Sequence, residues 1–450
     1  MPTRSTAPAP PARAPLGLPD IAAVWGPLAA SWALMGLELP VVSAVMARLP
    51  QPEVSLAAYG GLVFPTALLI ESPIIMLLAA STALVCDIQA YRLVRRFMLG
   101  TASSLVALHA LVAFTPLFDV LAVHLLAVPP ETREPARMGL RLMLPWVIAI
   151  ALRRTEQGVL IRSGRPRAVT IGTAVRLGSE SAVLAAGLAY GRLPGIVVGT
   201  CAISCGVLSE ALYATIAVRP ALREMRERPP SAHPLTMRAF LRFYLPLMVT
   251  PLISFIAMPL GSAAMSRMPH ALASLAAWPV LSGASFTMRS LGFAYNEVVV
   301  SQLDRWRPVP ALRRFAVLLS AAASAVLLVT AATPVGMAWF AGVSALPPAL
   351  LPLAAGGLWW LALSPATTVW QSYWQGALVH SRRTRGVTES VVVLLVVTAA
   401  VLGAGVVWQG APGIYFAAAG MLLGGAAQAA WLGLRAQEPL RAIAARDVVS

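Results

Sequence analysis

Long apolar segments follow one another along almost the whole of this 450-residue chain, separated by short stretches rich in arginine and proline. Hydrophobic residues make up 58% of the chain and charged residues 12%, whereas globular domains average roughly 45–50% apolar and about 25% charged residues. A run of about 20 apolar residues is long enough to cross the hydrocarbon core of a bilayer as an α-helix. We therefore expect an all-α polytopic membrane protein and exclude a soluble enzyme.

About twelve such segments fit the chain. The first twenty residues are rich in proline and alanine and are expected to form a disordered cytosolic tail. The first apolar segment is too long to be the hydrophobic part of a cleavable signal, so it should remain as a span. The expected spans lie near residues 22–46, 54–82, 97–118, 138–161, 168–190, 195–218, 240–264, 270–300, 312–334, 347–378, 387–409 and 414–434.

The basic residues indicate which loops face the cytosol. All 34 are arginine, and cytosolic loops of membrane proteins are enriched in basic residues. With both termini inside, most arginines lie in cytosolic segments. The external ones are Arg48, Arg133, Arg137, Arg141, Arg192 and Arg267. This bias predicts cytosolic N- and C-termini in a bacterial inner (plasma) membrane, and it makes anionic lipid, rather than nucleic acid, the partner of the net charge of +16.

Several chemistries are excluded by what the chain lacks. Without lysine there is no phosphate-binding G-x-x-x-x-G-K-[ST] loop and no Schiff base to retinal or pyridoxal. The three cysteines, Cys86, Cys201 and Cys205, do not form a disulfide framework. Cys201 and Cys205 lie one helical turn apart, but no histidine or third cysteine is near, so packing is favoured over metal binding. We expect no cofactor, no metal site and no enzymatic activity.

The two halves of the chain are related by an internal repeat of 219 residues. The matching pairs include prolines, an arginine and a methionine in loop register, which chance matching of alanine and leucine does not explain. They are Pro27-Leu28 with Pro246-Leu247, Pro40 with Pro259, Ser43-Ala44 with Ser262-Ala263, Met46 with Met265, Arg48 with Arg267, Pro50 with Pro269, and residues 55–58 with 274–277.

The repeat predicts two parallel six-helix lobes, because both copies begin on the cytosolic side. We expect an N-lobe over residues 21–218, a cytosolic linker over 219–239, a C-lobe over 240–435 and a cytosolic tail over 436–450. In transporters built from such repeats the substrate site lies between the lobes. The arginines inside the spans should therefore line a chamber there.

Four local strings, together with the repeat, resemble the progressive ankylosis protein family. That family belongs to the larger group that contains multidrug and toxic compound extrusion (MATE) transporters and lipid-linked oligosaccharide flippases. The strings are LAAYG at 56–60, QGVLIR at 157–162, FYLPL at 243–247 and AWPV at 277–280. The resemblance spans roughly residues 24 to 435. It implies a V-shaped, twelve-helix alternating-access fold and the export of organic anions such as citrate, nucleotides or pyrophosphate.

Charged residues within spans are the candidate functional residues, because each costs about 2.5–3.5 kcal/mol on insertion scales unless it has a partner or reaches water. Glu38 and Glu71 lie near the middle of the first two spans without a basic neighbour one turn away. Burial disfavours a charged carboxylate, so both are candidate sites for coupling to H⁺ or Na⁺. The alternative is a carboxyl group bonded to a neighbouring helix.

The fourth and fifth spans carry arginines beside acids. Arg153 is placed to meet Glu156 and Gln157 on its own helix, whereas Arg154 points elsewhere. In the fifth span, Arg176 and Glu180 are four residues apart. These residues are either an ion-pair network that joins the two spans or part of a substrate site, for which the planar guanidinium group suits carboxylate and phosphate.

Arg289 is the candidate anion-binding residue of the second half. It lies in a span interrupted by Pro279, Gly283 and Gly292, where helix-breaking residues are typical of a central site. Glu297 is the alternative, since it could neutralise Arg289 in a structural pair.

The sequence thus favours a secondary transporter that exports a small organic anion. Arg153, Arg154, Arg176 and Arg289 would bind the substrate, Glu38 and Glu71 would couple transport to an ion, and Glu156, Gln157, Glu180 and Glu297 would support them. A lipid-linked oligosaccharide flippase, a cation-coupled multidrug exporter and a non-transporting membrane scaffold stay open as alternatives.

Overall fold

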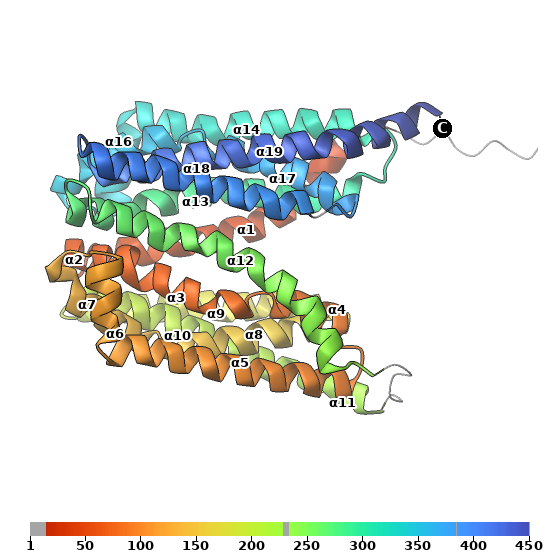
Figure 1. Ribbon diagram of the computed structural model, residues 1–450, viewed down its shortest axis with the longest axis horizontal. Coiled ribbons are helices and arrows are strands. Elements are labelled where there is room, and N and C mark those ends of the chain that lie inside the picture. Colours follow the sequence, from red (N-terminus) through yellow and green to blue (C-terminus); the bar gives the residue numbers. More distant parts are fainter. Residues whose placement is uncertain (1–14, 228–233, 384, 450) are drawn as a thin grey trace, which may run out of the picture.

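The computed structural model describes residues 15–227, 234–383 and 385–449, and every regular element among them is a helix (Figure 1). The prediction of an all-α polytopic membrane protein is confirmed. Most of the expected N-terminal tail lies outside the described residues. The remainder is ordered from residue 15, because the buried Leu16 donates its backbone N–H to the carbonyl of Trp306.

The helices of the first half are α1 (Leu18–Met46), α2 (Pro52–Ala58), η1 (Tyr59–Val63), α3 (Phe64–Glu71), η2 (Ser72–Ile74), α4 (Leu77–Leu84), α5 (Ile88–Phe114), α6 (Leu117–Asp119), η3 (Val120–Leu125), α7 (Pro130–Leu142), α8 (Leu144–Arg162), α9 (Pro166–Tyr190), α10 (Gly195–Ala217) and α11 (Arg219–Glu227). Those of the second half are α12 (Met237–Met265), α13 (Ala271–Gln302), α14 (Pro308–Ala332), α15 (Pro334–Ala338), η4 (Trp339–Val343), η5 (Pro348–Leu350), α16 (Leu351–Leu361), α17 (Ser364–His380), α18 (Arg385–Trp408) and α19 (Gly413–Val449).

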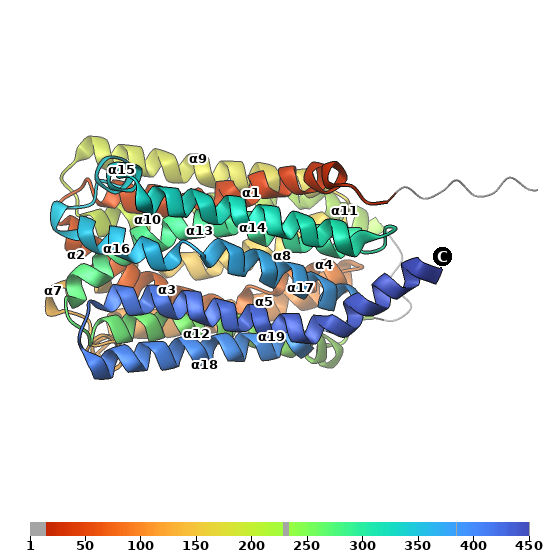
Figure 2. The ribbon, with the colours of Figure 1, turned by 90° about the horizontal axis from the view of Figure 1, so that it is seen from above.

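Ten helices among the described residues are long and apolar enough to cross a membrane, and α7 with α8, bent by 40°, makes eleven. The remaining expected span is α9, which is 25 residues long but carries polar residues such as Arg176 and Glu180. It packs along α10 at the outer edge of the bundle (Figure 2). Helices also extend past the apolar segments. The expected tail at 436–450 continues α19 as far as Val449.

Two groups of helices lie side by side, and we call them the N-lobe (α2 to α10) and the C-lobe (α13 to α19) (Figure 1). Between them run α1 and α12, the first helix of each repeat. Each packs extensively on the second span of the opposite half: α1 on α13, and α12 on α3 and η2. Both helices contain prolines at repeat-related positions, Pro27 and Pro40 in α1 and Pro246 and Pro259 in α12. Proline removes a helix hydrogen bond and favours bending.

The repeat is visible in the backbone as well as in the sequence. The π-helices η3 and η4 begin at Val120 and Trp339, one repeat length apart. Residues with left-handed backbone conformation also occur in pairs about one repeat apart: Gln51 and His270, Ala127 and Ala345, Gly164 and Arg382, and Gly191 and Gln409. A duplicated sequence that repeats such uncommon conformations has duplicated its fold.

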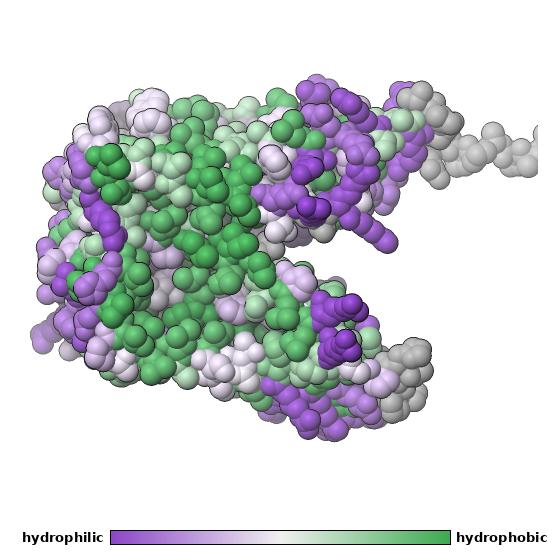
Figure 3. All heavy atoms as spheres, viewed as in Figure 1, coloured by the Kyte–Doolittle hydropathy of each residue, from purple (hydrophilic) through white to green (hydrophobic). Residues whose placement is uncertain are grey.

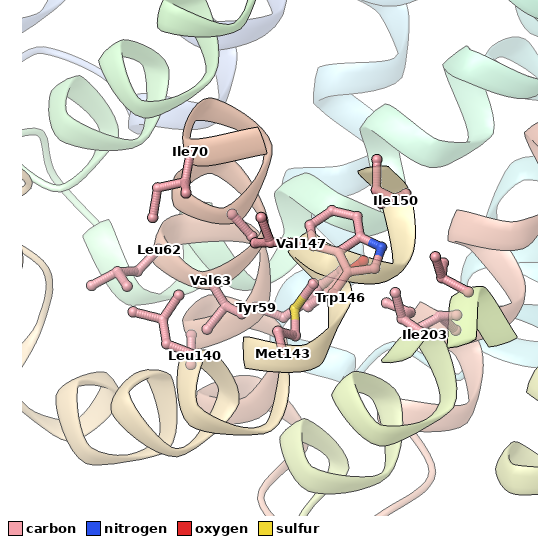
Figure 4. Packing of buried hydrophobic residues seen from close by; sticks show 14 of the residues in the cluster. Tyr59, Leu62, Val63, Ile70, Leu140, Met143, Trp146, Val147, Ile150 and Ile203 are labelled. Carbon is pink, nitrogen blue, oxygen red and sulfur yellow. The ribbon is translucent and has the colours of Figure 1, made fainter. Parts of the chain in front are cut away.

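The two halves meet tightly near the start of their second spans. A Cβ atom on Gly60 would lie 2.8 Å from Cδ of Pro279, its repeat counterpart, and one on Gly61 would lie 3.1 Å from Leu275. The apolar core continues from this contact into the N-lobe, where Tyr59, Leu62, Val63, Trp146 and Val147 pack together (Figure 4).

At the opposite end the lobes separate. Figure 3 shows a deep hollow between them that opens beside α11 and the end of α19, with hydrophilic residues on both rims. We call this the open end and the end bearing α2, α7 and α16 the closed end. Figure 3 shows a band of hydrophobic residues between the two ends, and many large hydrophobic side chains, such as Val396, are exposed, as a lipid-facing surface requires.

Candidate functional site

Glu210 on α10 is the centre of a buried polar network in the N-lobe. Its side chain is fully buried and accepts hydrogen bonds from Arg153 Nη1 at 2.8 Å, Gln157 Nε2 at 2.9 Å and Thr173 Oγ1 at 3.4 Å. These donors come from α8 and α9, so one carboxylate joins three helices. A buried ion pair of this kind is stable only when the geometry is good and further hydrogen bonds satisfy the charges, which Glu210 achieves.

Arg176 on α9 extends this network to α1. Its guanidinium group forms an ion pair with Glu38, and its Nη1 lies 4.0 Å from Glu210 Oε2. The side chains of Arg176 and Glu38 are 15% and 14% exposed, so water weakens this contact little. Glu38, which has no basic neighbour one turn away on its own helix, is therefore neutralised from another helix, as in the alternative given above.

The pairing expected within single helices is wrong. Arg153 does not bond to Glu156; it reaches Glu210 on another helix, and Gln157 binds the same acid. Glu156 instead accepts a 2.9 Å hydrogen bond from the Tyr91 hydroxyl of α5. The physical reason is burial: α8 is surrounded by other helices, so its side chains find partners across helix contacts rather than along its own surface.

Glu180 forms no ion pair with Arg176, although the two residues are four positions apart on α9. Its side chain is buried, its Oε2 has no hydrogen-bond partner, and it interacts electrostatically with both Glu38 and Arg176. The buried hydroxyl of Tyr59 likewise lacks a partner and interacts electrostatically with both acids. Arg176 is thus committed to Glu38, and Glu180 is left as a second acid beside that pair.

Glu71 and Arg154 interact electrostatically, but no hydrogen bond or ion pair joins them among the described residues. Glu71 on α3 is 3% exposed, and its Oε2 has no hydrogen-bond partner. Its strongest electrostatic interaction with a charged residue is with Arg154 on α8. Within the described part of the chain, Arg154 forms no ion pair with a carboxylate, and its Nε is unbonded. This arginine therefore keeps free hydrogen-bonding capacity.

We call these residues the N-lobe network, and its acids outnumber its bases. It consists of the carboxyl groups of Glu38, Glu71, Glu180 and Glu210 and the guanidinium groups of Arg153, Arg154 and Arg176. With every group ionised it would hold one uncompensated negative charge in the interior. Since an isolated buried charge is very costly, a proton or a bound cation would be retained there.

Arg289 on α13 is held without an acid. Its Nε donates to Thr368 Oγ1 at 2.9 Å, Nη1 lies 3.9 Å from Met421 Sδ, and the guanidinium carbon lies 5.6 Å from the centre of the Phe293 ring. None of the ion pairs formed by described residues includes it. A half-buried arginine held by a hydroxyl group and an aromatic ring is oriented but not neutralised, which is what anion binding requires.

The proposed neutralisation of Arg289 by Glu297 is wrong. Glu297 lies two helical turns further along α13, its side chain is exposed, and it forms no ion pair among the described residues. The expected chamber lined by four arginines is also revised, because Arg153 and Arg176 are already engaged by carboxylates of the N-lobe network.

Sequence reasoning missed Glu210 as the central residue of the site. The available signal was that Glu210 is a single acid in an otherwise apolar span, while another span of the same half carries Arg153 and Arg154. Thr368 was missed as well, because neighbouring threonines in a span have no distinctive pattern. Among the described residues, no three His, Cys, Asp or Glu side chains gather in a cluster that could hold a metal ion.

Comparison with known proteins places the fold but not the family. No family model and no curated protein sequence matches the chain. Solved structures do match over nearly its full length. The chain resembles an inward-facing MATE family transporter of the MOP superfamily with a TM-score of 0.66 and 15% identity, covering 92% of this chain and 98% of that one.

Two further structures have the same architecture. The lipid II flippase MurJ in an inward closed conformation gives a TM-score of 0.68 at 13% identity, covering 95% of this chain and 91% of that one. A MOP superfamily transporter from Pyrococcus furiosus, described as having a binding pocket of reverse polarity, gives 0.57 at 14% identity, covering 94% and 96%. The fold of this multi-pass membrane protein is therefore that of the MOP superfamily structures.

Proposed function

We propose that this chain is a secondary transporter that moves a small organic anion across a bacterial inner membrane by rocking its two lobes, with both termini in the cytosol. The observation that carries the proposal is an uncompensated Arg289 in a two-lobed, internally repeated fold whose interior opens at one end. The architecture is like that of transporters described as inward-facing and inward closed. In such folds a central site is exposed to each side in turn.

Substrate contact is assigned to Arg289 and Arg154. The other two candidates, Arg153 and Arg176, are held by Glu210 and Glu38, so their role is to orient those acids. Guanidinium groups bind carboxylate and phosphate through two parallel hydrogen bonds. Citrate, nucleotides and pyrophosphate, which the resemblance to the progressive ankylosis family implies, all present such groups.

Coupling to H⁺ or another cation is assigned to Glu71 and Glu180. Both are buried and have a carboxylate oxygen without a hydrogen-bond partner, whereas Glu38 is occupied by Arg176. An acid that gains and loses charge during the cycle must not be permanently paired. Arg153, Glu210, Arg176 and Glu38 would then transmit the change, because ion pairs link them to one another.

A flippase for an anionic lipid is the second candidate, and one surface favours it. Arg238, Arg242 and Phe243 line a hollow of about 660 Å³ at the start of α12, and all three are exposed. The two arginines suit the anionic head group of a lipid, and the apolar residues beside them suit its hydrocarbon chain. The similarity in fold to MurJ is compatible with this candidate.

Uptake into proteoliposomes distinguishes the two. We expect labelled citrate, ATP or pyrophosphate to accumulate, and Arg289→Ala to lower that uptake at least tenfold. Arg314→Ala is the matched control, because Arg314 is exposed on α14 near the open end. A fluorescent polyprenyl pyrophosphate, quenched from outside, reports lipid flipping in the same vesicles. Flipping without anion uptake would favour the flippase. The absence of both activities would refute transport.

A further inference from the structure

Two arginine side chains form hydrogen bonds between the lobes at the closed end. Arg48 follows α1 and Arg267 follows α12, so they occupy equivalent positions in the two repeats. Both side chains are exposed, and neither forms an ion pair among the described residues. Neither belongs to the N-lobe network.

Arg48 binds its own helix and the opposite lobe at once. Its Nη1 donates to the carbonyl of Ala44 in α1 at 2.7 Å, and its Nη2 donates to the carbonyl of Gly342 in η4 at 2.7 Å. The first bond caps the end of α1 and fixes the direction of the side chain. The second joins the end of α1 to the C-lobe.

Arg267 forms the equivalent bonds in the opposite direction, from the end of α12 to the N-lobe. Its Nη1 donates to the carbonyl of Ala263 in α12 at 2.7 Å, while Nη2 donates to the carbonyls of His124 and Leu125 in η3 at 3.1 and 2.9 Å. Ala263 is the repeat counterpart of the residue that Arg48 caps. The backbone carbonyl of Arg267 accepts a 2.7 Å bond from Gln409 Nε2, which holds this segment in place.

The acceptors explain why arginine occupies both positions. Each is a carbonyl at or near the end of a π-helix, η3 or η4, where backbone acceptors lack partners within the helix and the helix dipole favours a positive charge. The guanidinium fork can reach two carbonyls on different segments, whereas the ammonium group of lysine is a point charge. The duplicated π-helix and the duplicated arginine thus form one repeated unit.

The segment after α1 is held to α10 of the N-lobe by the bond from the Gly195 N–H to the carbonyl of Pro50, and the segment after α12 is held to the C-lobe by Gln409. Each arginine therefore joins the two lobes, and its bonds to η3 or η4 can exist only while this end is closed. We propose that Arg48 and Arg267 are paired gate residues that hold this end shut and release it when the lobes rock. The acceptors are neutral carbonyls, so breaking the contact leaves no buried charge unpaired. The contacts are exposed and few, so they bias the equilibrium without locking it.

Loss of the one interlobe bond of Arg48, or of the two interlobe bonds of Arg267, should shift the population ratio of the two states by about threefold to tenfold, given net values near 1 kcal/mol for a hydrogen bond. The two arginines act on one equilibrium, so their effects should multiply in the double variant. This inference rests on the proposed alternating access, but it is measured without substrate.

The experiment measures the distance across the closed end in reconstituted protein. Native cysteines are replaced by serine, and spin labels are placed at Glu131→Cys in α7 and Ala349→Cys in η5, both exposed. We expect Arg48→Gln and Arg267→Gln each to increase the long-distance population, and the double variant to increase it further.

Arg192→Gln is the matched control, since Arg192 is exposed between α9 and α10 at the same end and no hydrogen bond to the other lobe involves it among the described residues. Distance distributions for both gate variants equal to that of this control would overturn the gate. A single distance in every variant and under every gradient would refute alternating access itself. If the double variant does not fold, the two single variants still decide the question independently.

Discussion

Replacing Glu210 by glutamine removes the charge at the centre of the N-lobe network while keeping its shape. Arg153, whose side chain is 9% exposed, would then be left as a buried cation without its acid. Breaking a buried pair by removing one partner costs about 3–5 kcal/mol. Because Gln157 and Thr173 also donate to this acid, and an amide accepts more weakly than a carboxylate, we expect the loss to lie in the upper part of that range.

The assay is the free energy of unfolding in mixed micelles, measured for Glu210→Gln, Arg153→Met and the double variant. Replacing both charges should recover most of the loss, because a buried pair contributes little relative to apolar residues of similar volume. Glu438→Gln is the control, since it breaks an exposed ion pair with Arg383. A single variant as stable as this control, or a double variant no better than the single, would refute the network as a source of structural stability.

Two other perturbations test the contact between the halves and the coupling acids. Gly60→Val should destabilise the protein by about 1–3 kcal/mol through overpacking against Pro279. Gly100→Val, where a Cβ meets no atom within 4 Å, is the control and should change the melting temperature little. Equal shifts in melting temperature for the two variants would contradict the contact. Glu71→Gln and Glu180→Gln should fold normally, because each acid has an oxygen without a partner, yet lose gradient-driven anion uptake at least tenfold while retaining anion exchange. Gradient-driven uptake that survives in both variants would exclude these acids from coupling.

The architecture could be predicted from the sequence because a bilayer restricts the possible folds. Apolar segment length sets the spans, and the 219-residue repeat sets their grouping. The repeat continues into features that no residue identity indicates, such as the π-helices η3 and η4 and the paired left-handed residues. Limits of spans were less predictable: α5 begins at Ile88 and includes Arg92, because helices continue beyond the hydrocarbon core.

The pairing of charges could not be predicted, because in a bundle it depends on contacts between helices. Spacing along one helix selected the ionisable residues of α8 and α9 as candidates, but it assigned them to neighbours three or four positions away. The structure pairs Arg153 with Glu210 and Arg176 with Glu38, at separations of 57 and 138 residues. Helix rotation and crossing determine these contacts, and neither is encoded in a local pattern.

The duplicated fold has specialised its two halves differently, and α1 is where the difference acts. The C-lobe has uncharged residues where the N-lobe network has charges: the counterparts of Glu38, Arg153, Arg176, Glu180 and Glu210 are Ala257, Gln371, Leu394, Thr398 and Gln428, at a spacing of 218 residues for the last four. By contrast, the contacts that hold α1 and α12 across the lobes are kept in both halves.

Near the open end, Trp25 of α1 donates to the carbonyl of Leu291, and its counterpart Tyr244 of α12 donates to that of Pro73. Only α1 has an acid between its cross-lobe contacts, namely Glu38. Under the proposed function, a change of charge in the N-lobe network would therefore act, through the pair of Glu38 with Arg176, on a helix that is bonded to the C-lobe at both ends. On α12 the corresponding position is alanine, so the same signal has no route there. Under the proposed coupling, ion binding in one lobe would be converted into lobe movement through α1.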